Sequence, residues 1–200
     1  MERIGEIVEA STTRFRAVAP DTFAPPAFGS FVRTSSDERT TYAVVAHVEH
    51  ASLDPSRRAI PLGRTWDELR SEQPQVLELL TTEFEGVCVA FAADGDDPVA
   101  YLPPVPPRVH DFVFACERDE IVVLTEDLGF VRTVAACGSP VTVELVAAAI
   151  REAADARDED GFLLRAGREV ADLYRQDYEQ ASAILRRLGV GVRPRVGARR

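Results

Sequence analysis

The chain of 200 residues contains no lysine and no asparagine, so all 23 of its basic residues are arginines. Without lysine there can be no phosphate-binding loop of the Gly-x-x-x-x-Gly-Lys type, because that loop needs a lysine to reach the nucleotide phosphates. A lysine Schiff base and a lysine general base are excluded for the same reason. Nucleotide hydrolysis through such a loop and lysine-based covalent catalysis are therefore outside the chemistry of this chain.

Long apolar runs and a cysteine framework are also missing. No apolar run approaches the roughly 20 residues that span a bilayer, and Met1 to Glu6 lacks the basic-then-apolar order of a secretory signal. Cys88, Cys116 and Cys137 are odd in number and lie far apart in apolar segments, which favours reduced core thiols over disulfides or a metal site. We therefore expect a cytoplasmic protein without membrane contact.

Acidic residues are in excess, and the formal net charge is −10. Residues 1–116 carry 10 arginines against 18 acidic residues, and residues 117–200 carry 13 against 15. An acidic body disfavours a broad nucleic-acid surface, because it repels phosphates. With 46% hydrophobic residues, the chain is long enough for one sizeable core or two small ones.

Short apolar segments in the first half of the chain predict strands. Six segments carry this pattern: residues 4–18, 28–34, 41–50, 84–92, 99–102 and 111–116. The alternation is clearest in 41–50, whereas 84–92 is continuously apolar from Val87, as in a strand buried on both faces. Residues 94–98 should form a turn that leads back into 99–102 as a hairpin. About six strands are enough to close a small antiparallel barrel, which removes exposed edges.

The stretch from Tyr101 to His110 contains four prolines. Proline removes a backbone donor and fixes φ, so this stretch cannot be a helix interior or a central strand and should run extended. Strand patterns dominate before it, and helix patterns dominate after Cys116. We therefore predict a semi-rigid hinge at which a β module gives way to an α module.

Helix signals appear in one insertion and throughout the second half. Thr65 and Glu68 form a capping box that should start a short helix, and 73–80 should form another. Further helices are predicted over 119–124 and 126–136, from Ser139-Pro140 onward, along the apolar stripe within 163–174, and from Asp177 to Gly189.

These patterns predict an α+β protein with an N-terminal closed antiparallel β-barrel of about six strands followed by an α-helical region. The barrel occupies residues 1–116, with a helical insertion near 65–82. A helical bundle follows over 117–189, and residues 190–200 form a basic flexible tail.

Several short passages of the first half resemble the HAS-barrel family. They are Ile4 to Val8, the Gln73–Leu80 passage followed by Thr82–Gly86, and Leu102 to His110 leading into Phe112-Val113. This family joins the HerA-type DNA-translocating ATPases and the rotary ATP synthases. The resemblance implies a small barrel that packs against neighbouring barrels in a ring, contributes no catalytic residue and precedes a motor domain. Here only about 85 residues follow, without a lysine for the motor, so any motor activity must belong to another chain.

Three groups of histidine or acidic residues are candidate sites of chemistry. His47 and His50 are three residues apart in a predicted strand, so they point to opposite faces and cannot share one ion. Asp94 to Asp97 lacks the ligand spacing of a calcium loop and is interpreted as a hairpin turn. His110, beside Asp111, is interpreted as a buried hydrogen-bonding residue, with acid-base chemistry as the alternative. We expect no cofactor.

The C-terminal segment holds six arginines and no acidic residue after Leu185. They are Arg186, Arg187, Arg193, Arg195, Arg199 and Arg200. Such a segment can contact the phosphates of DNA or RNA or the acidic face of another subunit. The alternative is a solvated terminus or one paired within the chain, because arginines without interleaved aromatics are a weak nucleic-acid signature.

No catalytic motif emerges, so the leading hypothesis is a non-catalytic assembly or adaptor protein rather than an enzyme. It would self-associate through its barrel or dock on a partner ATPase or nuclease of DNA processing. One alternative is a nucleic-acid-binding accessory protein that uses the arginine tail. Another is a metal-dependent hydrolase with scattered carboxylates around His110.

Overall fold

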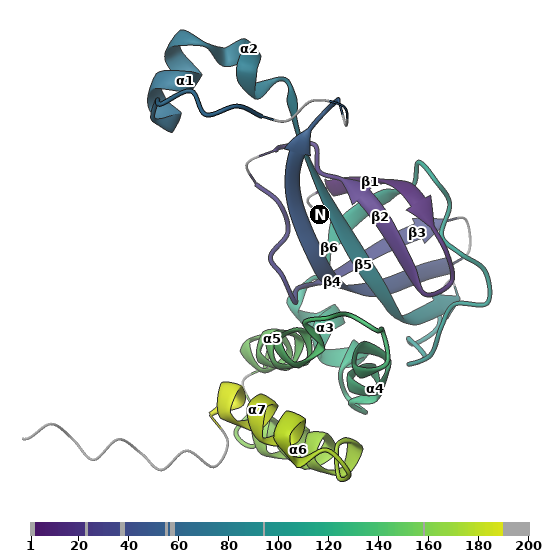
Figure 1. Ribbon diagram of the computed structural model, residues 1–200. Helices are drawn as coiled ribbons and strands as arrows, with labels where there is room; N and C mark the ends of the chain where they lie inside the picture. Colours follow the sequence, from purple (N-terminus) through teal and green to yellow (C-terminus); the bar gives the residue numbers. More distant parts are fainter. Residues whose placement is uncertain are drawn as a thin grey trace, which may run out of the picture.

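The computed structural model describes residues 3–22, 24–36, 39–54, 56, 59–93, 95–157 and 159–189. These residues form six strands and seven helices (Figure 1). The strands are β1 (Arg3–Ala10), β2 (Arg14–Val18), β3 (Phe31–Ser36), β4 (Arg39–Ser52), β5 (Leu80–Ala93) and β6 (Phe112–Ala115). The helices are α1 (Trp66–Glu72), α2 (Pro74–Leu77), α3 (Arg118–Leu124), α4 (Gly129–Ala135), α5 (Thr142–Asp155), α6 (Phe162–Leu173) and α7 (Tyr178–Leu188).

The strands close into a barrel in the order β1-β2-β5-β4-β3-β6, and β6 returns to β1. Every neighbouring pair is antiparallel. Register shifts interrupt the β1–β2, β1–β6 and β4–β5 ladders, and such irregularities bend strands as closure of a small barrel requires. The predicted α+β class, with an N-terminal barrel followed by helices, is confirmed.

Aromatic rings fill the interior of this narrow barrel where glycines face them. Phe15 on β2 pairs with Gly86 on β5, and a Cβ at Gly86 would lie 2.6 Å from Cζ of Phe15. A Cβ at Gly5 would likewise lie 2.7 Å from the Phe84 ring. The buried interior residues are Ile7, Phe15, Ala17, Ala19, Val32, Ala43, Val45, Phe84, Cys88 and Val113.

The helices α3 to α7 lie below the barrel in Figure 1, where α4 contacts β5 while α6 and α7 pack on α5. Alternation along β4 makes this possible, because Ala43 and Val45 face the interior while Val44 joins a second apolar cluster with the helices. In that cluster the rings of Phe31 and Phe130 meet edge to face, with centroids 5.3 Å apart. Barrel and helices therefore share a core.

The segment 4–18, predicted as one strand, is a hairpin of β1 and β2. Ser11 turns the chain, because its backbone N–H donates to the Arg14 carbonyl over 2.8 Å. Its Oγ also accepts the N–H groups of Thr13 and Arg14, at 3.3 and 3.1 Å. A serine side chain that satisfies the local backbone in this way stabilises a turn over a continuous strand.

The predicted strand 99–102 is wrong. Only Val99 pairs with the sheet, through an isolated bridge to Phe91. Pro98 and Pro103 flank this short segment and lack backbone donors, so no ladder extends from the bridge. The number of strands still matches the prediction because the first segment contributes two.

The proline-rich stretch is not a hinge between a β and an α module. It connects β5 to β6 within the barrel, and β6 then pairs with both β1 and β3 and closes it. The change from strands to helices comes after β6, between Ala115 and Arg118. Strand pairing across the whole barrel, not the local backbone restriction, decides this placement.

The helix boundaries follow the predictions with small differences. The capping box is present, with Glu68 N–H 3.4 Å from Thr65 Oγ1 and Thr65 N–H 2.7 Å from Glu68 Oε2. Asp177 caps α7, and Gly189 ends it at φ 74°. The helix expected at Ser139-Pro140 begins at Thr142, because Ser139 accepts the Val141 N–H and forms a turn first.

Candidate interaction surfaces

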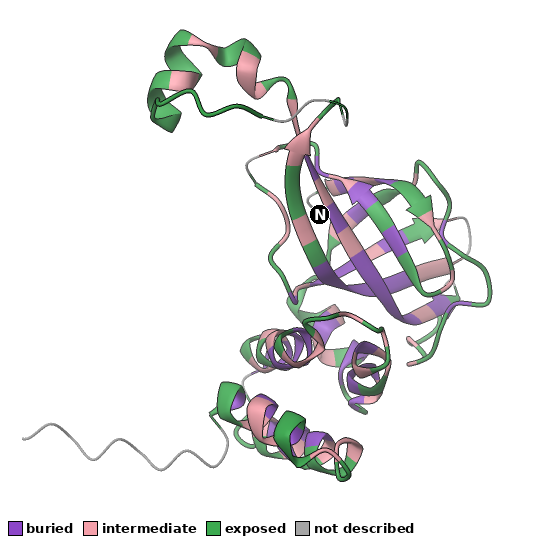
Figure 2. Ribbon diagram, viewed as in Figure 1, coloured by how far each residue is buried: buried purple, intermediate pink, exposed green. Residues whose placement is uncertain are grey.

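An arm, defined as the described residues 53–54, 56 and 59–79, extends from the barrel between β4 and β5. It carries α1 and α2 and lies at the end of the molecule opposite the helical layer (Figure 1). No residue of α1 or α2 is buried, and both helices are fully described. Figure 2 shows the same arm in the colours of exposed and half-buried residues. These helices of seven and four residues contact each other but have no fully buried face within the chain.

The arm exposes large apolar side chains to solvent. They are Leu53, Ile60, Leu62, Trp66 and Leu79. Isolated helices of this length are marginal in water, and helices in proteins owe most of their stability to a packed apolar face. Here the stabilising features are local, namely the capping box and an ion pair between Arg64 and Glu72. Contact with another chain would bury the apolar side chains.

Sequence reasoning placed helices in the arm but missed these residues as a surface. The signal was available, because Ile60, Leu62 and Trp66 stand in an otherwise polar insertion. What the sequence did not show was whether the barrel folds over them.

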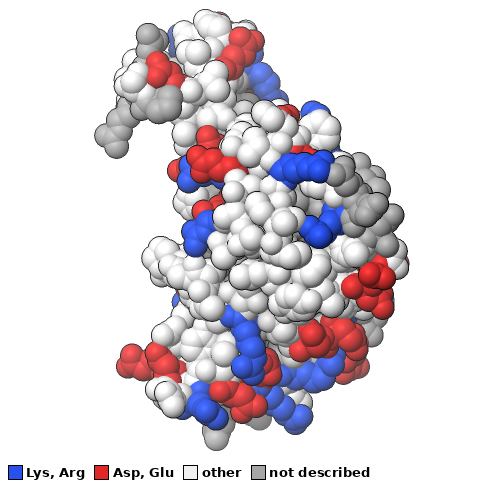
Figure 3. Space-filling view, turned by 90° about the vertical axis from the view of Figure 1, so that its right-hand side faces the viewer, with Lys and Arg blue, Asp and Glu red and all other residues white. Residues whose placement is uncertain are grey.

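The proline-rich segment, residues 98–110, is the second exposed apolar surface. It runs along the right-hand side of the barrel in Figure 1. Its exposed large apolar residues are Val99, Tyr101, Leu102, Val105 and Val109. Figure 3 looks at this side of the molecule and shows a broad area without charged side chains over the barrel.

Contacts at both ends hold the proline-rich segment against the barrel. At its start the rings of Tyr101 and Phe91 meet edge to face, with centroids 5.2 Å apart. At its end the His110 N–H donates to the Ile7 carbonyl over 2.8 Å. Asp111 accepts the Arg108 N–H over 3.1 Å and the Ser36 hydroxyl. Between these anchors, Pro103 and Pro107 are buried against the barrel.

His110 lies outside, contrary to the prediction of a buried residue. Its side chain is mostly exposed, and Nδ1 lies 2.8 Å from Glu6 Oε1. The backbone at His110 is left-handed, at φ 75°, a strained conformation for a residue other than glycine. Its hydrogen bonds to β1 hold it there, so the residue serves as an anchor of the segment.

The other candidate metal residues also have local partners. His47 Nε2 lies 3.6 Å from Glu49 Oε2, whereas His50 Nδ1 lies 2.6 Å from Thr82 Oγ1. The Asp96 N–H donates to the Ala93 carbonyl in a turn after β5, and Asp94 lies outside the described residues. Within the described ranges, no three His, Cys, Asp or Glu side chains come together to hold a metal ion.

Two of the six C-terminal arginines belong to α7. The Arg187 guanidinium pairs with Glu144 on α5, with Nε 2.6 Å from Oε2, and this bond lowers the pKa of that carboxyl. Arg186 Nε donates to the Ser182 carbonyl over 3.2 Å. The remaining four, Arg193, Arg195, Arg199 and Arg200, lie outside the described residues. Arg187 thus has an intramolecular role in joining α7 to α5.

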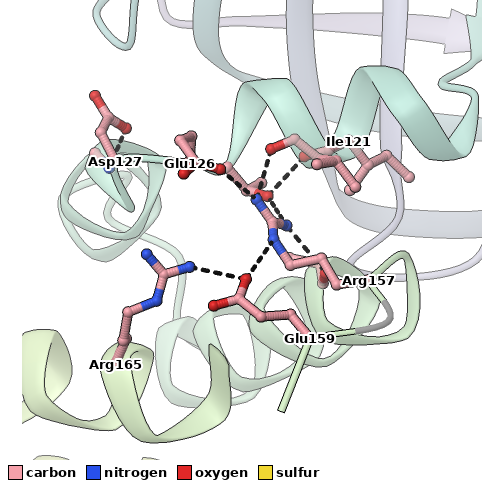
Figure 4. A network of polar contacts seen from close by, with 10 residues as sticks. Ile121, Glu126, Asp127, Arg157, Glu159 and Arg165 are labelled. Carbon is pink, nitrogen blue, oxygen red and sulfur yellow. Dashed lines mark hydrogen bonds and ion pairs between the residues drawn. The ribbon is translucent and has the colours of Figure 1, made fainter. Parts of the chain in front are cut away.

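Arg157, which the sequence did not single out, is the centre of a buried polar network (Figure 4). Its side chain is 3% exposed. It donates to the Val122 carbonyl over 2.5 Å, to the Ala153 carbonyl over 3.2 Å and to the Thr125 hydroxyl. Glu126 and Glu159 lie 3.6 and 3.7 Å away and supply countercharge.

The network satisfies carbonyl groups at the C-terminal ends of two helices. Val122 and Ala153 stand in the last turns of α3 and α5, where carbonyls lack a following helical N–H. The guanidinium also lies over the Phe162 ring, 4.4 Å from its centroid. Burial lowers the pKa of Arg157, while the two glutamates oppose this shift. The residue thus joins α3, α5 and α6.

The cysteines are free thiols, as predicted. Cys88 lies inside the barrel, where burial raises its pKa to about 12. Burial also raises the pKa of the Cys116 thiol, and the nearby Glu120 carboxylate adds to this effect. Both thiols therefore stay protonated and unreactive near neutral pH.

No protein-family model matches the chain, and a search of curated proteins finds no match. None of the helices in the described part of the chain combines the length and apolar character needed to cross a bilayer.

Proposed function

We propose that this protein is a non-catalytic assembly or adaptor protein that joins other protein chains through its barrel and arm. The observation that carries this proposal is the arm, which presents two helices without a buried residue and several large exposed apolar side chains. Exposed apolar clusters of this kind are typical of protein interaction sites.

The sequence resemblance to HAS barrels supports the same role. In that family the barrel packs against neighbouring barrels and leaves catalysis to another domain. The partners we propose are a second copy of this chain, or an ATPase or nuclease of DNA processing.

Two other functions have less support. A nucleic-acid role for the C-terminal arginines loses one candidate contact, because Arg187 is paired with Glu144. A metal-dependent hydrolase at His110 would need converging acidic ligands, and the described surroundings of His110 offer Glu6 alone as a direct side-chain partner. The assembly role needs neither feature.

Sedimentation of the full chain at tens of micromolar tests the proposal. We expect the wild-type protein to self-associate or to bind a co-expressed ATPase or nuclease. The double variant Ile60→Glu/Leu79→Glu should reduce that association at least about tenfold, because it places charges where apolar side chains must be buried.

Leu164→Glu/Val123→Glu provides the matched control. Leu164 on α6 and Val123 on α3 are each 51% exposed, so this double variant also adds two negative charges at exposed apolar sites. The control should associate like the wild type. A wild-type protein that stays monomeric and captures no ATPase or nuclease would refute the assembly role.

A further inference from the structure

A cavity of about 470 Å³ lies where the barrel, the proline-rich segment and the helices meet. Its walls come from β2 with the turn before it, from β5, from residues 100–102 and from α4 with the residues that follow it. Cavities that hold small molecules have volumes of roughly 300–1,000 Å³ and often lie between structural units. Distant parts of the sequence therefore build a cavity with the size of a small-molecule site.

One part of the cavity wall is apolar and open to solvent. It includes Tyr101 and Leu102, which are 61% and 40% exposed. The Tyr101 ring is held by its edge-to-face contact with Phe91, and the buried Val87 on β5 also lines the cavity. A flat apolar ligand would cover surface that the described chain leaves in contact with water, and burial of such surface favours binding.

Another part of the wall carries two arginines, Arg14 from β2 and Arg132 from α4. No acidic residue is among the described residues that line the cavity. Arg14 Nη1 lies 3.2 Å from Glu85 Oε1, and Arg132 Nε lies 3.1 Å from Glu169 Oε1. Arg14 Nη2 also donates to the Cys137 carbonyl over 3.1 Å, so β2 and the chain after α4 are joined at this wall.

The ion pairs of these arginines leave them able to bind an anion. The side chains of Arg14 and Arg132 are 49% and 64% exposed, and exposed ion pairs contribute little to stability. A guanidinium group also carries more N–H donors than these contacts use. Both arginines can therefore donate to a ligand in the cavity and keep their glutamate partners.

We propose that this cavity binds a small organic anion with a flat apolar body, such as an aryl carboxylate. The anionic group accepts hydrogen bonds from Arg14 and Arg132, because guanidinium donors match the geometry of a carboxylate. The apolar body packs on Tyr101 and Leu102, where stacking on the phenol ring adds to the gain from burial. A ligand of this kind matches both parts of the wall. This binding function goes beyond the assembly role and does not depend on it.

A larger cavity of about 600 Å³ is a poorer anion site, although Arg39 and Arg108 line it. The Asp111 carboxylate accepts the Arg108 N–H over 3.1 Å and the Ser36 hydroxyl, and both of these residues line the cavity. A carboxylate at the wall repels an anion. The described lining of this cavity also contains no aromatic residue.

NMR titration of the full-length protein with naphthalene-2-carboxylate tests the proposal. We expect saturable shifts in the amide signals of Thr13, Tyr101 and Thr133, which line the cavity, and none in α1 or α2. Naphthalene-2-carboxamide has the same apolar body without the charge, and acetate has the charge without the apolar body. Each of these should bind at least about tenfold more weakly, because each matches one part of the wall only.

Arginine variants test the charged part of the wall. Arg14→Gln and, separately, Arg132→Gln should weaken binding of naphthalene-2-carboxylate at least about fivefold, since each removes a charged donor. Arg16→Gln is the matched control: the Arg16 side chain is 44% exposed, and like Arg14 it lies on β2 and pairs with a glutamate on β5. Arg16 is not among the residues that line the cavity, so this variant should bind like the wild type.

Leu102→Glu tests the apolar part of the wall, because it places a negative charge where the body of the ligand packs. It should weaken binding at least about tenfold, and circular dichroism should show every variant folded. The proposal would be overturned by the absence of saturable shifts at the cavity, by equal affinities for the carboxylate and the carboxamide, or by equal losses in Arg14→Gln and Arg16→Gln. Shifts centred on the arm would also overturn it, since they would show binding to the apolar side chains there.

The same variants separate this inference from the assembly role. Ile60→Glu/Leu79→Glu should bind naphthalene-2-carboxylate like the wild type, and Arg132→Gln should self-associate like the wild type. A protein that self-associates but does not bind the carboxylate would overturn this inference and leave the assembly role standing.

Discussion

Replacing Arg157 with alanine should lower the free energy of unfolding by about 3 kcal/mol. The change removes the donors for the buried carbonyl of Ala153 and the half-buried carbonyl of Val122, and an unsatisfied buried acceptor costs about 1–3 kcal/mol. It also removes a cation from the ends of α3 and α5, where the helix dipoles favour positive charge. Relief from burying the guanidinium offsets part of this loss.

Urea unfolding followed by circular dichroism measures the change in the free energy of unfolding. Thermal unfolding provides a second measurement, because a loss of about 3 kcal/mol in a chain of this size lowers Tm by roughly 6–12 °C. Arg157→Lys should recover part of the stability, because an ammonium keeps the charge but cannot match the fork of guanidinium donors. Arg16→Ala is the control, since Arg16 is exposed and its 3.4 Å ion pair with Glu83 should contribute less than about 1 kcal/mol.

Equal stabilities of Arg157→Ala and Arg16→Ala would refute this reasoning. Full recovery by Arg157→Lys would show that charge, not the directed hydrogen bonds, provides the stabilisation.

Three further predictions concern the barrel and the arm. The Cys88 thiol has an ordinary pKa of 9.0 when unfolded and about 12 when folded, so its contribution to stability is complete below pH 9. The free energy of unfolding should then fall by up to about 1.4 kcal/mol per pH unit between pH 9 and 12. The Cys88→Ala variant should lack this contribution to the pH dependence, and the same pH dependence in variant and wild type would contradict the prediction. Amides of α1 and α2 should exchange with deuterium far faster than those of β5, because no residue of the two helices is buried. Equal protection from exchange would indicate that another part of the protein or a second copy covers the arm. Gly86→Ala should destabilise the barrel by about 1–3 kcal/mol in urea, since its Cβ would lie 2.6 Å from the Phe15 ring, and an unchanged midpoint would show that the ring can move.

Local periodicity predicted most of the secondary structure, and the exceptions have identifiable causes. Residues 4–18 alternate like one strand, yet Ser11 bonds the local backbone and turns the chain. The serine and threonines at this position suit a turn as well as a strand, so the pattern alone did not separate them. Val99 does meet the sheet, but the flanking prolines limit it to one bridge.

The interaction surfaces were less accessible to sequence reasoning. The capping box of Thr65 and Glu68 predicted where α1 begins, but it carries no information on whether another element covers the helix. Arg157 is one of 23 arginines, and its carbonyl partner Val122 lies 35 residues away in sequence. Both features depend on packing between distant segments, which no local pattern records.

The sequence by itself determined that a strand-rich half precedes a helical half, that lysine chemistry is absent and that residues 101–110 cannot form a helix or a central strand. These are consequences of side-chain periodicity, composition and the proline ring, all of which act locally. The tertiary structure decided that the proline-rich segment lies within the barrel and faces solvent, because β6 beyond it must pair with β1 and β3 to close the sheet. Closure of the barrel brings together residues more than 100 positions apart, such as Glu6 and His110. The sequence predicted a hinge here, whereas the folded chain holds the segment against the barrel at both ends.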